Sequence, residues 1–328
     1  MLQIWLHIWV GTVIVFLVSR NIVSLDDSTK SILAGLNESC KNTTCLPGLQ
    51  CNKNYICKVE SDTCMSYRWS DNLWKPSCDE DGTWSAVQCK GEQLHGRCFC
   101  YNTNGSRIFG WSWWHSAGNM TCACSRRRDT LKNQGRENVT LHCSEDGNYE
   151  KLQCDSGLCW CVDPQTGEPT ERAYPESMMT HLSCYDKDKI GSQYLRLCES
   201  MHIARLEVID KLERHGRLYA HIDTVNCDGD GSYAYYSLNG SIVYCLWKNG
   251  MRIDLYQTPL SSILTVNCNC ARDSYIYRQA NLTFSLQCQS NGNYKPEQTS
   301  NGYPFCVDSD GYATTTLGSF GETLICKE

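Results

Sequence analysis

Cysteine is the residue type with the most chemistry in this sequence. There are 24 cysteines in 328 residues, an even number and roughly 7% of the chain, far above ordinary usage. Cysteines serve as disulfides, zinc thiolates or nucleophiles, and their spacing separates these uses. The sequence contains no Cys-x-x-Cys pair, the spacing typical of structural zinc sites. We therefore expect every cysteine to be in a disulfide, and we expect no metal or other cofactor.

The other reactive residues form no catalytic pattern. The sequence has no Gly-x-Ser-x-Gly elbow, no His-Glu-x-x-His pair and no glycine-rich phosphate loop. Its eight histidines are scattered, and His115 and His181 are expected to be solvated surface residues. Asp228 and Asp230 could suggest calcium, but two carboxylates without further oxygen ligands make a weak site. We expect that the protein is not an enzyme.

The N-terminal residues predict entry into the secretory pathway. Residues 4–18 are almost entirely apolar, yet as a helix they would span only about 22 Å, less than a bilayer core. We interpret residues 1–24 as a signal peptide, cleaved after Ser19 or Ser24. No lysine or arginine precedes the apolar run, and an uncleaved anchor is the alternative.

Seven Asn-x-Ser/Thr sequons also favour secretion and N-glycosylation. Secretion makes disulfides the expected state of the thiols, and we expect no membrane association after cleavage. The sequons begin at Asn37, Asn42, Asn104, Asn119, Asn138, Asn239 and Asn281.

The overall composition excludes several classes of protein. A net charge of -6 and a pI near 5.8 argue against a nucleic-acid-binding protein, which needs a basic surface. A hydrophobic content of 41% excludes a disordered chain, and a mean hydropathy of -0.43 excludes a protein with many membrane spans.

Two stretches of the sequence repeat one cysteine-containing pattern. Residues 143–154 read C-S-E-D-G-N-Y-E-K-L-Q-C, and residues 159–163 read C-W-C-V-D. Residues 78–89 read C-D-E-D-G-T-W-S-A-V-Q-C, and residues 98–101 read C-F-C-Y. The later copy closely resembles the thyroglobulin type-1 domain, whose signature is C-D-x-D-G-x-Y-x-x-x-Q-C followed by C-W-C-V. The earlier copy is similar, with Phe-Cys-Tyr replacing Trp-Cys-Val.

Two weaker copies of the pattern follow, and they bear on the disulfide pairing. An ungapped alignment puts Leu238 and Val243, and then Thr299 and Pro304, where the stronger copies have their third and fourth cysteines. The two cysteines are lost together in both copies, as expected if they form one bond, because losing only one would leave a free thiol. This comparison supports the order first–second, third–fourth and fifth–sixth, which the resemblance also implies.

This order gives ten disulfides and leaves four cysteines for a separate N-terminal knot. For the knot we expect the interleaved pairs Cys40–Cys51 and Cys45–Cys57, although its other pairings stay open. The ten pairs are Cys64–Cys78, Cys89–Cys98, Cys100–Cys122, Cys124–Cys143, Cys154–Cys159, Cys161–Cys184, Cys198–Cys227, Cys245–Cys268, Cys270–Cys288 and Cys306–Cys326.

The expected fold class is a tandem of small disulfide-rich α+β modules, each with a short helix and a small antiparallel sheet, and no single large core. A unit of about 60 residues buries only a marginal core, and each disulfide adds about 2–4 kcal/mol. One residue separates units one and two, and units three and four, so each doublet should be rigid. The segments are the N-terminal knot-like segment (25–60), unit one (61–123), unit two (124–184), a linker (185–197), unit three (198–269) and unit four (270–328).

The resemblance implies two kinds of function. Some thyroglobulin type-1 domains inhibit papain-like cysteine proteases by wedging loops into the active-site cleft, and others are binding or spacer modules of matrix and growth-factor-binding proteins. We expect an extracellular protein-binding module, with protease inhibition as the alternative. In unit two the wedge would be residues 133–141 with Ser156, Gly157 and Leu158 beside them, although a glycan on Asn138 would obstruct it. Residues 71–75, 214–224 and 278–284 are the corresponding candidates in units one, three and four.

Two further sequence features could contact a partner. Trp111, Trp113 and Trp114 lie within four residues, and tryptophan is favoured at binding hot spots. Packing over a small core is the other interpretation of this cluster. Residues 126–128 are three consecutive arginines, which could bind heparin, be cut by a protease or form a solvated helix face.

Overall fold

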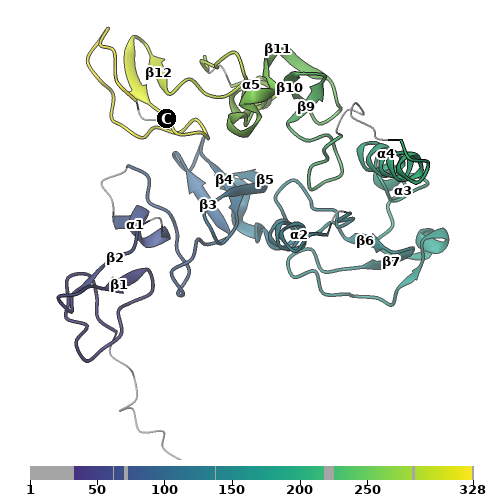
Figure 1. The fold of residues 1–328 in the computed structure, drawn as a ribbon, viewed down its shortest axis with the longest axis horizontal. Coiled ribbons are helices and arrows are strands. Elements are labelled where there is room, and N and C mark those ends of the chain that lie inside the picture. Colours follow the sequence, from purple (N-terminus) through teal and green to yellow (C-terminus); the bar gives the residue numbers. More distant parts are fainter. Residues whose placement is uncertain are drawn as a thin grey trace, which may run out of the picture.

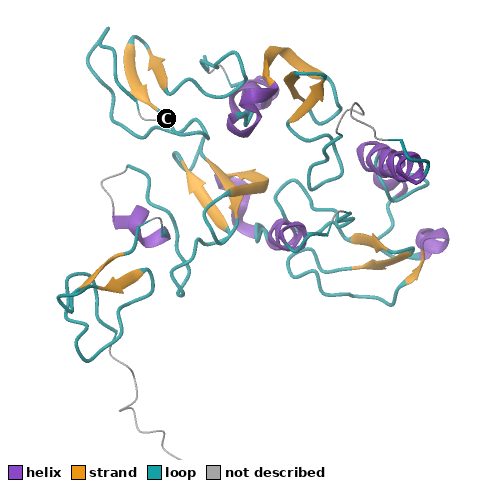
Figure 2. Cartoon of the chain, viewed as in Figure 1, coloured by secondary structure: helices purple, strands orange, loops and turns teal. Residues whose placement is uncertain are grey.

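The four units follow one another around a ring in a computed structural model of the chain (Figure 1). The structure describes residues 33–61, 63–69, 73–136, 138–217, 225–282 and 285–326, so the signal peptide expected at 1–24 lies outside the described residues. Within the described part, no helix is both long and apolar enough to span a bilayer. Loops make up most of the chain, between short helices and small sheets (Figure 2).

The N-terminal segment is a small module with two interleaved bridges. Strands β1 (Leu49–Cys51) and β2 (Cys57–Val59) form an antiparallel pair, and the disulfides Cys40–Cys51 and Cys45–Cys57 cross beside it. Ala34 and Leu49 are buried against these cystines. The disulfides thus supply much of the apolar interior that a module of this size lacks.

Each unit contains the same elements in the same order: a helix, a tight turn and an antiparallel sheet. A helix begins at or next to the opening cysteine, and an isolated bridge then joins the second cysteine to an aromatic residue across an Asp-Gly or Asn-Gly turn. The helices are α1 (Cys64–Trp69), α2 (Ala123–Asn133), α4 (Leu197–Arg214) and α5 (Asn269–Gln279). The strands are β3 (Val87–Lys90), β4 (Arg97–Tyr101) and β5 (Arg107–Trp113) in unit one, β6 (Leu152–Asp155), β7 (Leu158–Cys161) and β8 (Tyr174–Pro175) in unit two, β9 (Tyr236–Asn239), β10 (Ile242–Leu246) and β11 (Arg252–Pro259) in unit three, and β12 (Glu297–Ser300) and β13 (Tyr303–Cys306) in unit four.

All 24 cysteines are joined in disulfides, and the ten bonds of the four units run first–second, third–fourth and fifth–sixth where all six are present. The third–fourth bond lies between directly paired residues of neighbouring strands, with Cα atoms 4.0 Å apart for Cys154 and Cys159. In unit three Leu238 and Val243 pair directly at the same register position, and Val243 is buried. Apolar packing there replaces the disulfide. The loss is small, because a disulfide that closes so short a loop restricts the unfolded chain only a little.

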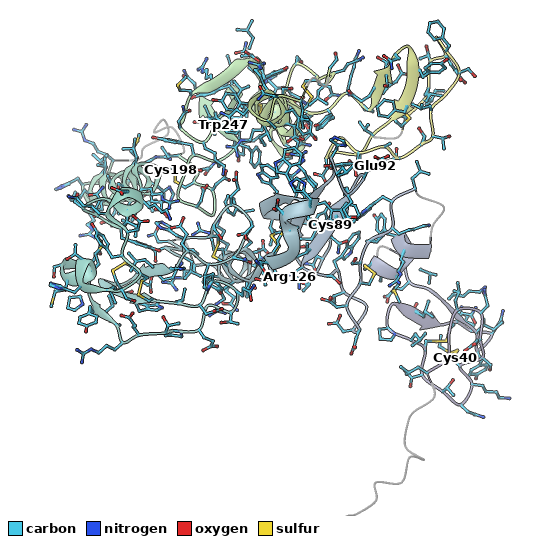
Figure 3. All side chains as sticks on the ribbon, turned by 180° about the vertical axis from the view of Figure 1, so that it is seen from behind. Cys40, Cys89, Glu92, Arg126, Cys198 and Trp247 are labelled. Atoms are coloured by element: carbon cyan, nitrogen blue, oxygen red, sulfur yellow. A yellow bond between two sulfur atoms is a disulfide. The ribbon has the colours of Figure 1, made fainter. Side chains whose placement is uncertain are left out.

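The one-residue junctions inside the doublets are fixed by the closing cysteines. Cys122 and Cys268 take left-handed φ values of 58° and 51° and stand directly before α2 and α5. One turn into α2, Arg126 donates to the carbonyls of Trp84 and Tyr101 in unit one, and Arg272 donates to those of Tyr233 and Leu246 in unit three. Figure 3 labels Arg126 where unit two meets unit one.

The segment 185–197, expected to be a linker, is folded and partly buried in the structure. This segment contains α3 (Lys187–Ile190), and Tyr194 is 4% exposed and stacks on His142 of unit two at 4.2 Å between ring centroids. His142 in turn bonds Glu199 of α4 through Nε2 and Oε2 at 2.7 Å. The two doublets are therefore in contact. His142 of unit two packs on Tyr194 of the segment and hydrogen-bonds Glu199 of unit three.

Candidate functional site

A stapled hairpin projects from unit two. Strands β6 and β7 are joined by Ser156 and Gly157, whose φ values of 52° and 77° are those of a tight two-residue turn. Cys154–Cys159 links the strands directly behind this turn. Ser156 and Gly157 are exposed, and Leu158 is 48% exposed. The tip thus presents an apolar side chain on a backbone that has little freedom to lose.

Asp155 ties this hairpin to a second loop. Its carboxylate accepts hydrogen bonds from Arg136 Nη2 at 2.5 Å, from Thr140 Oγ1 at 2.9 Å and from Ser156 Oγ at 3.3 Å. Partial burial acts to raise the pKa of Asp155, but the bonds from Arg136 and Thr140 outweigh it and the pKa lies below its usual value. We call residues 138–141 and 155–158 the loop pair, since Asp155 holds them side by side.

The base of the loop pair is fixed from beneath. Arg128 of α2 is buried and donates to the carbonyls of Val139 and Leu141, while Tyr194 donates to the carbonyl of Thr140 at 2.8 Å. Gln153 exchanges two hydrogen bonds with the backbone of His142 at 3.0 and 2.7 Å. A loop held in this way loses little conformational entropy when a partner docks.

The corresponding hairpin of unit one carries different residues at the same positions. Lys90 and Arg97 pair directly beyond Cys89–Cys98, as Asp155 and Leu158 do beyond Cys154–Cys159. Both cations are buried, and Arg97 is fully inaccessible. Figure 3 labels Cys89 and Glu92 along this hairpin. Two adjacent cations in the interior of a protein require carboxylate partners.

Unit four supplies those carboxylates. Arg97 forms a bidentate pair with Asp273 of α5 at 2.7 and 2.5 Å, and Lys90 contacts Asp308 and Asp310 at 2.7 and 2.6 Å. Burial acts to lower the pKa of Arg97, but Asp273 outweighs it and the pKa lies well above its usual value. The hairpin base of unit one is thus occupied by the chain's own fourth unit, which closes the ring (Figure 1).

The three tryptophans of unit one make contacts within the molecule, with α5 and with the interior of unit one. Trp113 stacks on Tyr277 of α5 at 5.9 Å, and Trp111 meets Trp113 edge-on at 5.5 Å. Trp114 packs on the cluster that includes Cys98 and Met120. All three rings are partly buried, so intramolecular packing accounts for much of this cluster.

The arginine run 126–128 is also used within the chain. Arg126 bonds carbonyls of unit one and Arg128 bonds carbonyls of the loop pair, so two of the three guanidinium groups already have partners. This leaves Arg127 alone as a weak basis for a heparin site.

The remaining loop candidates are only partly described. Residues 71–72, 218–224 and 283–284 lie outside the described residues, so the wedges expected at 71–75, 214–224 and 278–284 are not compared with the loop pair. Each of the seven sequon asparagines is exposed, as glycan attachment requires. Among the described residues, the cysteines at 40, 45 and 57 form a close group of potential metal ligands, but all three are in disulfides and have no thiolate to offer.

Comparison with known proteins assigns the first two units. Residues 49–122 and 123–180 match the family model of the thyroglobulin type-1 repeat. The chain contains two tandem thyroglobulin type-1 repeats. The first match begins inside the N-terminal module, and the second ends within unit two. Units three and four share the order of elements and the disulfide frame of these repeats.

Several relatives share this thyroglobulin type-1 region. U20-hexatoxin-Hi1a of Hadronyche infensa is 33% identical over 96 residues, which cover 28% of this chain and 62% of the toxin. Equistatin of Actinia equina is 33% identical over 97 residues, covering 27% of this chain and 40% of equistatin. Human thyroglobulin is 32% identical over 100 residues, covering 27% of this chain and 3% of thyroglobulin. The chain thus spans less than two thirds of the length of each of these relatives.

Two features of the site were not foreseen from the sequence. The first is the acidic loop 308–312 of unit four, whose Asp-Ser-Asp-Gly-Tyr sequence faces two unusual lysine and arginine positions in unit one. The available sequence signal for this contact was the pair of cations beside the third–fourth disulfide of unit one. Unit two has Asp155 and Leu158 at these positions. The second is the His142–Glu199 contact between units two and three, for which no sequence signal was available.

Proposed function

We propose that this chain is a secreted, non-enzymatic protein-binding protein that presents the loop pair of unit two to an extracellular partner. The contrast between the two repeats carries the proposal. The hairpin base of unit one is filled by unit four, whereas the equivalent Leu158 of unit two is 48% exposed. Units three and four also expose apolar residues at this register position, Ile242 and Tyr303, but of these three units only unit two has a disulfide behind the turn there.

Inhibition of a papain-like cysteine protease is the second candidate, and one observation favours it. The loop pair combines an exposed leucine, a disulfide directly behind the turn and a hydrogen-bonded neighbouring loop. A segment inserted into a protease cleft must resist cleavage, and a backbone held at both ends does so because it cannot relax after the first cut. The family resemblance points to the same class of protease.

Titration against papain tests the inhibitor candidate. The full-length chain, expressed in a cell that glycosylates, is titrated before and after glycan removal, together with Leu158→Asp. Leu94→Asp is the matched control, since Leu94 is 75% exposed in the hairpin loop of unit one. Under the inhibitor hypothesis Leu158→Asp loses at least tenfold in affinity and Leu94→Asp retains full inhibition.

Two outcomes would overturn these proposals. No inhibition by either form at micromolar protein would reject the protease candidate. Capture of an extracellular partner that Leu158→Asp binds as tightly as the unaltered chain would reject the loop pair as the binding surface. N-terminal sequencing of the protein from culture medium tests secretion, with a new terminus after Ser19 or Ser24 expected.

A further inference from the structure

A cavity of about 440 Å³ lies between units two and three. Its walls include Arg128 and Lys132 of α2, Ile203 of α4, Tyr236 at the start of β9 and Tyr235 directly before it. This volume falls in the ~300–1,000 Å³ range typical of small-ligand sites. Its lining combines aromatic rings with hydrogen-bond donors and with the carboxylates of Glu199 and Asp228, a mixture that suits a polar molecule with flat apolar faces.

Asn138 also lines this cavity and is the acceptor of the sequon Asn138-Val139-Thr140. Its side chain is exposed, whereas the next residue, Val139, is 8% exposed. The carbonyls of Val139 and Thr140 accept hydrogen bonds from Arg128 and Tyr194. The backbone that would carry a sugar is therefore fixed beside the cavity, and none of the other six sequon asparagines lines it.

The chemistry of the lining matches a carbohydrate. The first sugars of an N-glycan are neutral pyranoses with acetamide and hydroxyl oxygens, which accept hydrogen bonds from a cationic group such as that of Lys132. Tyr235 and Tyr236 lie 4.9 Å apart between ring centroids and are partly exposed. Aromatic faces of this kind pack against the C–H face of a sugar ring.

We propose that the first sugars of an N-linked glycan on Asn138 occupy this cavity, bracing unit two against unit three and leaving the hairpin tip at 156–158 uncovered. The proposal bears on the function proposed above, because it removes the obstruction that a glycan on Asn138 would otherwise cause. It is nevertheless tested without any protease or partner.

Glycan release under native conditions tests the proposal. The glycosylated chain is incubated with peptide:N-glycosidase, and mass spectrometry follows the release at each site. The glycan on Asn138 should be released at least tenfold more slowly than those on Asn104 and Asn239, and the difference should vanish after denaturation. Equal rates in the native protein, or an Asn138 that carries no glycan, would overturn the proposal.

A pair of variants on α4 separates occupancy of the cavity from simple crowding. Ile203→Trp fills the cavity and should bring release from Asn138 up to the rate of Asn104. Val208→Trp, at an exposed position of the same helix, is the matched control and should leave the slow release unchanged. If Ile203→Trp is not secreted, thermal unfolding decides instead: Asn138→Gln should lower Tm by several degrees and Asn239→Gln should not, and equal values contradict bracing.

Discussion

The hairpins of units one and two share a sheet pairing and a disulfide, yet they face different surroundings. Beyond the shared cystine, unit one has Lys90 and Arg97, which are buried against the carboxylates of unit four. Unit two has Asp155, which organises a neighbouring loop, and Leu158, which faces solvent. The repeat fixes the scaffold in both units, while two flanking residues determine whether its hairpin binds within the chain or remains free for a partner.

Removing the buried guanidinium of Arg97 is the strongest test of the contact between the hairpin of unit one and unit four. Arg97→Ala leaves Asp273 charged and buried without its main partner, which should cost about 3–5 kcal/mol in the free energy of unfolding. Chemical denaturation of the full chain measures this cost. The double variant Arg97→Met, Asp273→Leu should recover most of it, because neither member of this ion pair is then left as an unpaired buried charge. A loss below about 1 kcal/mol in the single variant would show that the contact is not formed in solution.

Acidification should weaken the same contact between units one and four. Burial acts to raise the pKa of Asp310, but Arg107 and Lys90 hold it far below its usual value. A carboxyl with a depressed folded pKa stabilises the protein above its unfolded pKa of about 3.9, and this stability is lost as the pH falls below that value.

Replacement of Asp310 isolates this pH dependence. Asp310→Asn should lower the free energy of unfolding by about 3 kcal/mol at pH 7. Between pH 5 and pH 2, the free energy of unfolding of this variant should fall less than that of the unaltered chain. Denaturation curves at each pH give both values. Asp155→Asn removes a carboxyl whose pKa is also lowered but which is only partly buried, and it should flatten the pH profile less than Asp310→Asn does. Parallel pH profiles for the unaltered chain and Asp310→Asn would contradict the assignment.

The staple of the free hairpin should contribute less to stability than to binding. Cys154→Leu with Cys159→Val reproduces the pair found in unit three, and loss of so short a loop closure should cost about 2 kcal/mol. Partner affinity should fall further, because the hairpin tip must then be ordered on binding. Thermal unfolding and a binding titration on the same sample measure the two effects, and an unchanged affinity would argue against preorganisation.

The smallest expected effect on stability is that of separating the two loops of unit two. Asp155→Ala removes the acceptor shared by Arg136 and Thr140, and this partly exposed position should change the free energy of unfolding by less than about 1 kcal/mol. Hydrogen exchange of the amides at 138–141 should nonetheless accelerate. Thr83→Ala, in a half-buried turn of unit one, should leave the hydrogen exchange of the amides at 138–141 unchanged.

Sequence reasoning reached the local features of this molecule because they depend on local signals. The cysteine order followed from four internal copies, and the structure joins the same pairs. The direct pairing of Leu238 with Val243 followed from the same alignment. A short helix and a small antiparallel sheet in each module were likewise expected, and each of the four units contains both.

The ring could not be predicted, because it depends on contacts between residues far apart in the chain. Lys90 and Asp310 are 220 residues apart, and neither residue alone indicates a buried partner. Tyr194 lies in the segment expected to be a linker, yet its ring stacks on His142 of unit two. Such contacts follow from how whole units are oriented, which hydrophobic periodicity and cysteine spacing do not encode.

The junction cysteines give the molecule a mechanical property. Cys122 and Cys268 each close one unit and set the direction of the next helix. Cutting the Cys100–Cys122 bond would therefore release the angle between two neighbours while both keep their opening bridges. Reduction would therefore let neighbouring units change their relative angle. Small-angle scattering after mild reduction should report a larger radius of gyration before the helical circular dichroism signal is lost.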